Sequence, residues 1–232
     1  DRVRCLTNIF TGRTGAQVAL RAHERGHGVT LLTSHPDVVT DLHGGPVSPE
    51  RWAVLRYRTL DELRELMRGA VQRGGVDAVI HSAAVSDYLS GGVYAPAEGT
   101  HFDSASGRWE GTAPALHDRA AAKVKSDEPE LWLRLVRAPK LIDLVRAEWG
   151  FRGVLVKFKL EVGVDEARLL DIAERSRRHS SADLVVANTL EGAGYWAYLG
   201  PVEGDYRRVG RRELAERLLE AVERLGAERS HG

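Results

Sequence analysis

The chain has 232 residues, a length suited to one large α/β domain. It carries 33 basic and 33 acidic residues, so its net charge gives no reason to expect nucleic acid or an anionic membrane as a partner. No apolar run approaches the roughly 18 residues of a membrane span, and the single cysteine, Cys5, fits a reducing compartment. We therefore expect a cytoplasmic protein that binds neither nucleic acid nor a membrane.

The first part of the chain alternates between predicted strands and helices. The stretch Asn8-Ile-Phe-Thr-Gly-Arg-Thr-Gly15 leads into a helical pattern over residues 16–25. Strands are expected at residues 29–33, 53–57 and 78–82. A capping box, Thr59-Leu-Asp-Glu62, starts another helix, and residues 35–50 are expected to form a surface loop. This alternation predicts a parallel sheet with right-handed crossovers.

Two stretches of this part carry groups suited to a binding site. Gly12 and Gly15 precede a helix, where bare backbone amides and the helix dipole favour an anion such as phosphate. The predicted strand at residues 78–82 ends in small residues, and the carboxylate of Asp87 follows. Ligands of open α/β sheets bind outside the carboxyl ends of strands. A tight turn without a ligand, and an aspartate that caps a turn, are the alternatives.

The middle of the chain changes in composition. Residues 89–122 are rich in Gly, Ala, Ser and Pro, which predicts a long connection without secondary structure, of the kind that forms a lid, a binding loop or a disordered segment. Lys123 and Lys125 follow it, and in a strand both would point the same way and form a cationic patch. A solvated loop with two lysines is the alternative. Residues 130–135 alternate and predict a half-buried antiparallel strand.

The C-terminal part continues the α/β pattern. Strands are expected at residues 154–158 and 183–188, a hairpin at residues 195–209, and helices at residues 140–149, 164–179 and 211–225. The arginines at positions 207, 208, 211 and 212 are interpreted as a solvated face. The whole pattern predicts an α/β fold of three layers, Rossmann-like, with a mostly parallel sheet and an antiparallel extension, in a single domain over residues 1–232.

Short motifs along the chain occur in a fixed order. They are Val3-Arg-Cys-Leu-Thr-Asn8, Thr11-Gly-Arg-Thr-Gly15, Ile80-His-Ser-Ala-Ala-Val-Ser-Asp-Tyr88, Lys123-Val-Lys-Ser126, Ala138-Pro-Lys-Leu-Ile142, Lys157-Phe-Lys-Leu-Glu161 and Asp183-Leu-Val-Val-Ala-Asn188. Each motif is weak alone. The ordered set resembles phosphopantothenate–cysteine ligase, the phosphopantothenoylcysteine synthetase of coenzyme A biosynthesis, in its stand-alone form.

This resemblance implies a ligation activated by a nucleotide. The carboxylate of 4′-phosphopantothenate would attack the α-phosphate of CTP or ATP in the presence of Mg²⁺ and release pyrophosphate. The amine of L-cysteine would then displace the nucleotide from the acyl-nucleotidyl intermediate. The resemblance also implies that residues 89–122 form a flexible flap over the intermediate. It further implies a homodimer, with a separate phosphopantothenoylcysteine decarboxylase as a candidate partner.

The resemblance implies roles for particular residues. Residues matched to the catalytic positions are Lys123, Asn8 and Asp87. Those matched to the phosphopantothenate site are Arg4, Asn8, Ala83, Ala84 and Asp87, with Arg4 reaching the substrate of the neighbouring subunit. Those matched to the nucleotide site are Gly12, Gly15, Phe158, Asn188 and Lys125. No metal ligand is assigned.

The chain departs from the family pattern at several places, including Arg178-His-Ser-Ser, where bacterial relatives often have a lysine before the last strand. The family carries a strand and a Gly-Gly-Thr phosphate loop just upstream of the motif that holds Arg4 and Asn8. Phe10 stands where the family has Ser or Thr, and Lys157 stands where a small residue usually precedes the Phe. These departures motivate a second hypothesis, a catalytically inactive relative that binds nucleotide.

A third hypothesis is an NAD(P)-dependent oxidoreductase of the short-chain-dehydrogenase type. It is suggested by the glycines of Thr11-Gly-Arg-Thr-Gly15 ahead of a helix. None of the six tyrosines has a lysine four residues further on, so the usual Tyr-x-x-x-Lys proton relay is missing. The sequence therefore favours the ligase.

Overall fold

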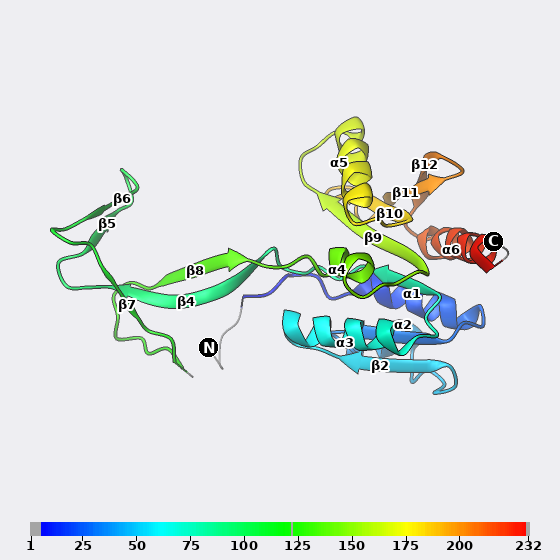
Figure 1. Ribbon diagram of the computed structural model, residues 1–232, viewed down its shortest axis with the longest axis horizontal. Helices are drawn as coiled ribbons and strands as arrows, with labels where there is room; N and C mark the ends of the chain where they lie inside the picture. Colours follow the sequence, from blue (N-terminus) through cyan, green and yellow to red (C-terminus); the bar gives the residue numbers. More distant parts are fainter. Residues whose placement is uncertain (1–5, 122, 231–232) are drawn as a thin grey trace. The chain divides into compact units, whose positions relative to one another are not determined.

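The computed structural model describes residues 6–121 and 123–230. The chain forms two compact units (Figure 1). Unit 1 comprises Asp1–Ile9 and Val85–Pro139, and unit 2 comprises Phe10–Ala84 and Lys140–Gly232. The segment 85–139 thus interrupts unit 2 in the sequence, and the prediction of one domain over residues 1–232 stays a prediction.

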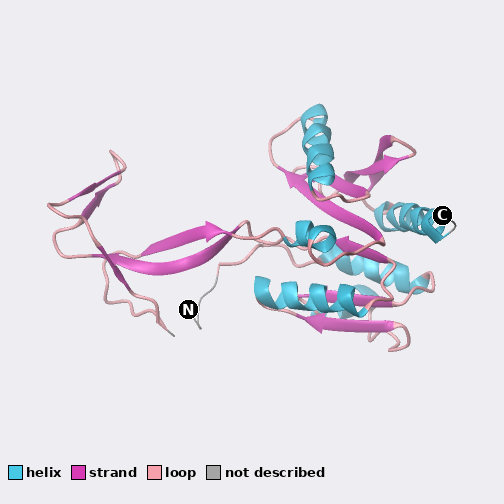
Figure 2. Ribbon diagram, in the orientation of Figure 1, coloured by secondary structure: helices cyan, strands magenta, loops and turns pink. Residues whose placement is uncertain are grey.

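Unit 2 has the expected α/β character (Figure 2). Its helices are α1 (Arg13–Glu24), α2 (Asp37–His43), α3 (Leu60–Arg73), α4 (Leu141–Ala147), α5 (Glu166–His179) and α6 (Leu214–Ser230). Its strands are β1 (Val29–Thr33), β2 (Trp52–Arg56), β3 (Ala78–His81), β9 (Val154–Glu161), β10 (Leu184–Thr189), β11 (Trp196–Val202) and β12 (Asp205–Gly210). The predicted Rossmann-like α/β class and the antiparallel C-terminal hairpin are confirmed.

The stretch predicted as a surface loop contains a helix, so that part of the prediction was wrong. The helix α2 begins after Pro36 and ends at Gly44, which adopts the left-handed conformation with φ 75°. Its side chain Val39 is buried in a cluster with Ala16 and Leu20 of α1. Tertiary packing against α1 therefore stabilises a helix too short to be predicted from local propensity.

The strands of unit 2 form two separate sheets. The larger sheet has the order β12-β11-β10-β9-β3, in which β3, β9 and β10 are parallel and the β11–β12 hairpin is antiparallel. The parallel pair β1–β2 stands apart, whereas the sequence predicted that β1, β2 and β3 share one sheet. A cavity of about 920 Å³ is lined by residues of both β1 and β3. Unpaired edges of the two strands therefore line a common space.

Both faces of the larger sheet are buried. On one face, apolar residues of β9, β10 and β11 pack with Val18 of α1 and with Leu218 of α6. On the other face, Val185 and Ala187 of β10 pack against Leu169 and Ala173 of α5. Burial on both sides explains why these strands have continuous apolar runs rather than an alternating pattern.

Ion pairs hold α1 beside α6. Arg25 donates from Nε to Glu223 Oε1 at 2.9 Å, and His27 Nε2 lies 2.7 Å from the same oxygen. Arg21 and Arg25 also contact Glu216. The Arg25 guanidinium is the main cause that lowers the pKa of Glu223 to about 2. These contacts fix the direction of α1 and thus the place of its N-terminus.

The predicted capping box of α3 forms with one change. Thr59 Oγ1 accepts a hydrogen bond from the amide of Glu62 at 3.2 Å. The Glu62 carboxylate accepts from the amide of Arg58 at 2.6 Å, one residue before the expected donor. The helix start predicted from sequence is therefore confirmed.

Unit 1 is a set of antiparallel strands. The strands β4 (Tyr88–Pro96), β7 (Leu116–Asp118) and β8 (Trp132–Arg137) form one sheet in the order β7-β4-β8. The strands β5 (His101–Asp103) and β6 (Arg108–Glu110) form a separate hairpin. Residues 89–122 therefore contain regular strands, and the predicted absence of secondary structure was wrong; the proposed role as a flap stays a prediction. The predicted antiparallel strand near residues 130–135 is confirmed as β8.

Contacts between aromatic rings hold the β5–β6 hairpin of unit 1 to β8. Phe102 lies 5.1 Å from Trp109 and 4.6 Å from Trp132, and the two tryptophans are 4.7 Å apart, between ring centroids. Phe102, Trp109 and Trp132 come from β5, β6 and β8 respectively, so the cluster ties the β5–β6 hairpin to the sheet. Such ring pairs stabilise by about 0.5–1.5 kcal/mol each beyond their buried area.

Candidate functional site

The N-terminus of α1 touches the carboxyl ends of two strands. Gly12, its N-cap, has φ 75°, a left-handed conformation that favours glycine, and no side chain caps the first turn. A Cβ on Gly12 would lie 3.7 Å from Thr33 Oγ1 at the end of β1. A Cβ on Gly15 would lie 2.6 Å from Ser82 Oγ, just after β3, so a side chain there would collide. Both predicted glycines thus lie where α1 meets the carboxyl ends of β1 and β3.

The segment after β3 forms the neighbouring wall. Ser82 and Ala83 are half-buried and Ala84 is exposed. The side chain of Ser82 approaches α1 closely at Gly15, which has no Cβ to block it. The arrangement gives a helix N-terminus and an open strand end in one place, which suits a phosphate-containing ligand.

Phe158 and Asn188 lie on one face of adjacent parallel strands. In the register of β9 and β10, Phe158 pairs with Val186 and Asn188 pairs with Leu160. Because every second residue of a strand faces the same side, Phe158 and Asn188 are diagonal neighbours on that side. Phe158 is half-buried and packs against the cluster that contains Val18 of α1. The structure thus places both residues on the sheet face that α1 covers.

Lys157 faces the opposite side of β9 and is buried, with 6% of its surface exposed. Its Nζ donates to Ser180 Oγ at 2.5 Å and to the Ser176 carbonyl at 2.9 Å. Ser180 Oγ in turn donates to Asp143 Oδ1 at 2.6 Å. Burial lowers the pKa of Lys157 to about 8. The residue that departs from the family pattern is therefore a structural tie between β9, α4 and α5.

His81 pairs with Lys157 across β3 and β9. Burial, followed by the nearby charge of Lys157, lowers the pKa of His81 to about 4. His81 is therefore neutral near pH 7. The sequence analysis assigned no role to this histidine, since nothing in the motif shows that a lysine lies beside it.

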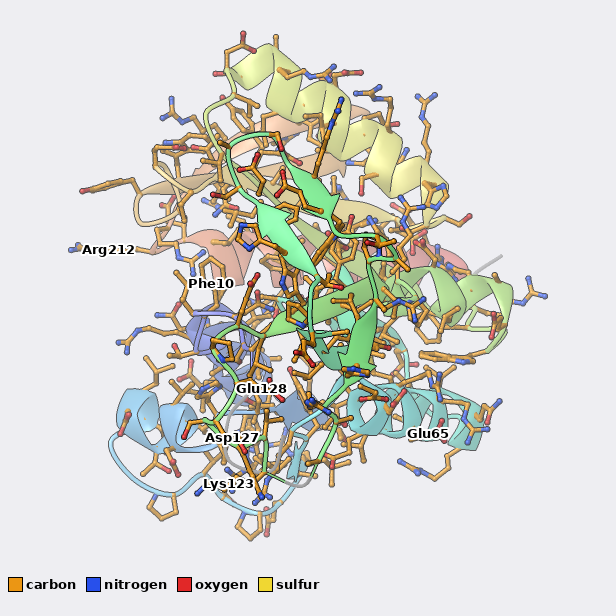
Figure 3. The ribbon with its side chains drawn as sticks, turned by 90° about the vertical axis from the view of Figure 1, so that its left-hand side faces the viewer. Phe10, Glu65, Lys123, Asp127, Glu128 and Arg212 are labelled. Carbon is orange, nitrogen blue, oxygen red and sulfur yellow. The ribbon has the colours of Figure 1, made fainter. Side chains whose placement is uncertain are left out.

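The remaining predicted residues belong to unit 1. Asn8, Asp87, Lys123 and Lys125 are all exposed. The backbone carbonyl of Asp87 accepts from the Ala138 amide at 2.9 Å, which fixes the start of β4 beside the end of β8. Lys123 lies on the irregular segment between β7 and β8, with Asp127 on the same segment (Figure 3).

Of the two alternatives for Lys123 and Lys125, the structure shows the loop, because it assigns no strand to the described residues of that segment. The alternation itself is present: Val124 is buried between two exposed lysines. The side-chain pattern therefore arises from a single buried valine rather than from strand pairing.

The predicted site residues thus fall into two sets. In unit 2 lie Gly12, Gly15, Ala83, Ala84, Phe158 and Asn188. In unit 1 lie Asn8, Asp87, Lys123 and Lys125. Arg4 lies outside the described residues. The joint action of the two sets stays a prediction.

The described residues hold no group of three or more histidine, cysteine, aspartate or glutamate side chains arranged to bind a metal ion. Likewise, no helix in the described part of the chain has the length and apolar composition to cross a membrane.

One contact near α1 was missed by the sequence analysis. The guanidinium of Arg211, which follows β12, donates a hydrogen bond from Nη2 to Thr14 Oγ1 in the first turn of α1. In the sequence, Arg211 is one of several clustered arginines, and only the turn of the chain after β12 brings it to α1.

Comparison with known proteins supports the resemblance. Residues 1–95 match the family described as the DNA/pantothenate metabolism flavoprotein C-terminal domain. The coenzyme A biosynthesis bifunctional protein CoaBC of Thermococcus kodakarensis is 29% identical over 97% of this chain and 48% of its own length. The resemblance to phosphopantothenate–cysteine ligase is confirmed. CoaBC of Methanocaldococcus jannaschii is 23% identical over 97% of this chain, and the chain spans about half the length of these curated relatives.

Solved structures agree in fold. The DNA/pantothenate metabolism flavoprotein of Streptococcus pneumoniae superposes with a TM-score of 0.71 at 28% identity, over 97% of this chain and 92% of that one. A Cab2 variant in complex with phosphopantothenate-cysteine superposes with a TM-score of 0.65 at 17% identity, over 99% of this chain and 82% of that one. At that identity the Cab2 likeness concerns the fold alone.

Proposed function

We propose that this chain is a phosphopantothenate–cysteine ligase. The observation that carries the proposal is the meeting of the α1 N-terminus, through Gly12 and Gly15, with the carboxyl ends of β1 and β3. The free backbone amides and the helix dipole at the N-terminus of α1 favour an anion. The residues around this N-terminus are among those that the ligase resemblance assigns to the substrate and the nucleotide. The related CoaBC proteins are named for coenzyme A biosynthesis, which supports the same reaction.

The proposed reaction is amide formation in two steps. The carboxylate of 4′-phosphopantothenate attacks the α-phosphorus of the nucleotide, forming a mixed anhydride and releasing pyrophosphate. The amine of L-cysteine then attacks the acyl carbon, loses a proton and expels the nucleoside monophosphate. Both steps need groups that hold anions in position more than they need an acid–base pair.

Residues of unit 2 serve the nucleotide in this proposal. The amides near Gly12 and Gly15 bind phosphate oxygens, and Phe158 with Asn188 lines the pocket for the nucleoside. Ala83 and Ala84 bind phosphopantothenate through their backbone, because small side chains leave the backbone accessible. The nucleotide is CTP or ATP.

Residues of unit 1 serve the acid and the intermediate. Asn8 and Asp87 bind phosphopantothenate, and Lys123 neutralises charge on the intermediate, with Lys125 beside it as a further cation for the nucleotide. Mg²⁺ carried by the nucleotide would neutralise charge on the phosphates and the leaving pyrophosphate. The strands over residues 89–122 would cover the mixed anhydride and exclude water.

We further propose that the cavity between β1 and β3 is the position of the strand that the family carries upstream of Arg2. A strand that precedes α1 pairs in parallel with β1 when the crossover is right-handed, and the edge of β1 that faces β3 is open. The test joins to Asp1 the segment that precedes the aligned region in the Thermococcus kodakarensis relative. We expect a higher Tm than with a scrambled segment; equal values would contradict this assignment.

We propose a cytoplasmic homodimer in which the sheet of unit 1 contributes the interface. Leu133 and Leu135 of β8 are 41% and 49% exposed, and Tyr88 of β4 is also exposed. In the register of β4 and β8, these three side chains share one face. An exposed apolar face on a narrow sheet favours association with a second copy, which would bury it.

The dimer proposal has a matched test. Leu135→Lys places a charge on that face, whereas Leu116→Lys changes a leucine of similar exposure, 43%, on the opposite face. We expect Leu135→Lys to produce monomers in light scattering at micromolar concentration and Leu116→Lys to remain dimeric. A monomeric wild-type chain, or equal behaviour of the two variants, would contradict the proposed interface.

The ligase itself is tested by pyrophosphate release from the purified chain with 4′-phosphopantothenate, L-cysteine and Mg²⁺, in parallel reactions with CTP and ATP. Release that depends on phosphopantothenate supports the ligase and identifies the nucleotide. Nucleotide binding without release would favour the inactive relative. Fluorescence changes on titration with NAD(P)H would favour the oxidoreductase.

A further inference from the structure

Arg211 differs from the arginines around it in its partners. Neighbouring arginines are paired with glutamates: Arg207 and Arg224 with Glu203, and Arg217 with Glu220. Within the described residues, the side-chain partner of Arg211 is the neutral hydroxyl of Thr14, and no carboxylate forms an ion pair with it. Its guanidinium is half-buried, and burial is the cause that lowers its pKa. Arginine nevertheless remains charged at any ordinary pH.

The position of this charge is unfavourable without an anion. Thr14 lies in the first turn of α1, where free amides and the helix dipole already carry partial positive charge. A half-buried guanidinium beside that turn adds charge of the same sign at low dielectric. The backbone holds it there, because the amide of Arg211 donates to the Tyr195 carbonyl at 2.8 Å. A bound anion would offset both charges.

We propose that Arg211 binds the triphosphate of the nucleotide, together with the amides of the first turn of α1. This inference rests on the proposed function, because it adds a residue to the nucleotide site of the ligase. The planar guanidinium can donate to two phosphate oxygens while Thr14 holds its orientation. Triphosphate and pyrophosphate, rather than the nucleoside, are the groups that Arg211 recognises.

The test compares Arg211→Gln with Arg212→Gln in the full chain. Arg212 is the adjacent arginine, is exposed and points outward (Figure 3), so it is a matched control for net charge. Calorimetric titration uses CTP, ATP, their monophosphates and pyrophosphate as separate probes. We expect Arg211→Gln to weaken binding of the active triphosphate and of pyrophosphate by about ten- to a hundredfold, since bonds from charged donors are strong. In Arg211→Gln, monophosphate affinity should change by about threefold or less. In Arg212→Gln, the affinity for every probe should change by about twofold or less, because an exposed charge contributes little.

Further measurements separate binding from folding. Arg211→Lys keeps the charge and should recover part of the affinity, and urea midpoints identify any variant that is merely unstable. In the amide-forming assay, Arg211→Gln should raise KM for the triphosphate more than it lowers kcat. Equal affinities of Arg211→Gln and the wild type would overturn the role of Arg211 while leaving the ligase intact. If the wild type binds triphosphate but makes no amide, and Arg211→Gln loses that binding, the role of Arg211 is supported and the ligase is overturned. If the wild type binds no triphosphate, both proposals are overturned.

Discussion

The two units of this chain bury their apolar residues in different ways. Unit 2 has aliphatic clusters on both faces of its larger sheet, with Leu218 fully buried. Unit 1 leaves Leu133 and Leu135 exposed and has tilted and edge-to-face ring contacts among Phe102, Trp109 and Trp132. The difference indicates that unit 2 is stabilised by its own core, whereas unit 1 presents apolar surface suited to an interface.

The largest change in stability is expected from a substitution that creates a cavity in the core of unit 2. Leu218→Ala removes a side chain that is 0% exposed and should lower the free energy of unfolding by about 2–5 kcal/mol. Leu116→Ala in unit 1, with 43% exposure, should cost less than about 1 kcal/mol. Urea unfolding followed by circular dichroism measures both, and equal losses would show that the two units are stabilised alike.

A second change separates activity from stability in unit 1. Lys123 is exposed, so Lys123→Ala should leave the urea midpoint unchanged. If Lys123 neutralises charge on the intermediate, kcat for amide formation should fall by about a hundredfold or more. Lys125→Ala is the neighbouring control and should have a smaller effect on kcat. Full activity of Lys123→Ala would rule out the assignment.

The aromatic cluster provides a local test. Trp109→Ala removes two ring contacts and should destabilise the β5–β6 hairpin by about 1–3 kcal/mol without affecting unit 2. Amide hydrogen exchange should then accelerate in residues 101–110 and stay unchanged in β9 and β10. Faster exchange throughout both units would mean that the cluster supports more than the hairpin.

The smallest effect is a dependence on pH in unit 2. The pKa of Lys157 is lowered to about 8 by burial, opposed by Asp143 and aided by Lys140 and Lys159. Between this value and the ordinary one near 10.5, the unfolded chain holds a proton that the folded chain has lost, so stability rises with pH. The gain should not exceed roughly 1 kcal/mol per pH unit and should vanish in Lys157→Met. Urea titrations at pH 7.5 and pH 10 measure the free energy of unfolding of the wild type and of Lys157→Met. An equal change in this free energy between the two pH values in both proteins would contradict the burial of Lys157.

Local signals carried much of the prediction. The capping hydroxyl of Thr59 marked the start of α3. Asp165, whose side chain accepts from the Arg168 amide at 2.8 Å, caps α5 in the structure and was not used in the prediction. Glycines before α1 indicated the turn at which that helix begins. The helix α2 and the strands within residues 89–122 were missed because packing and pairing with distant segments stabilise them.

The sequence by itself determined most helices and strands of unit 2, the α/β class and the motifs that resemble those of the ligase, because caps, turns and apolar periods depend on neighbours along the chain. Only the tertiary structure decided that β3 pairs with β9, that Lys157 is buried beside His81, and that Arg211 meets Thr14. These contacts join residues far apart in sequence. Their energies depend on burial and charge in three dimensions, which no local pattern encodes.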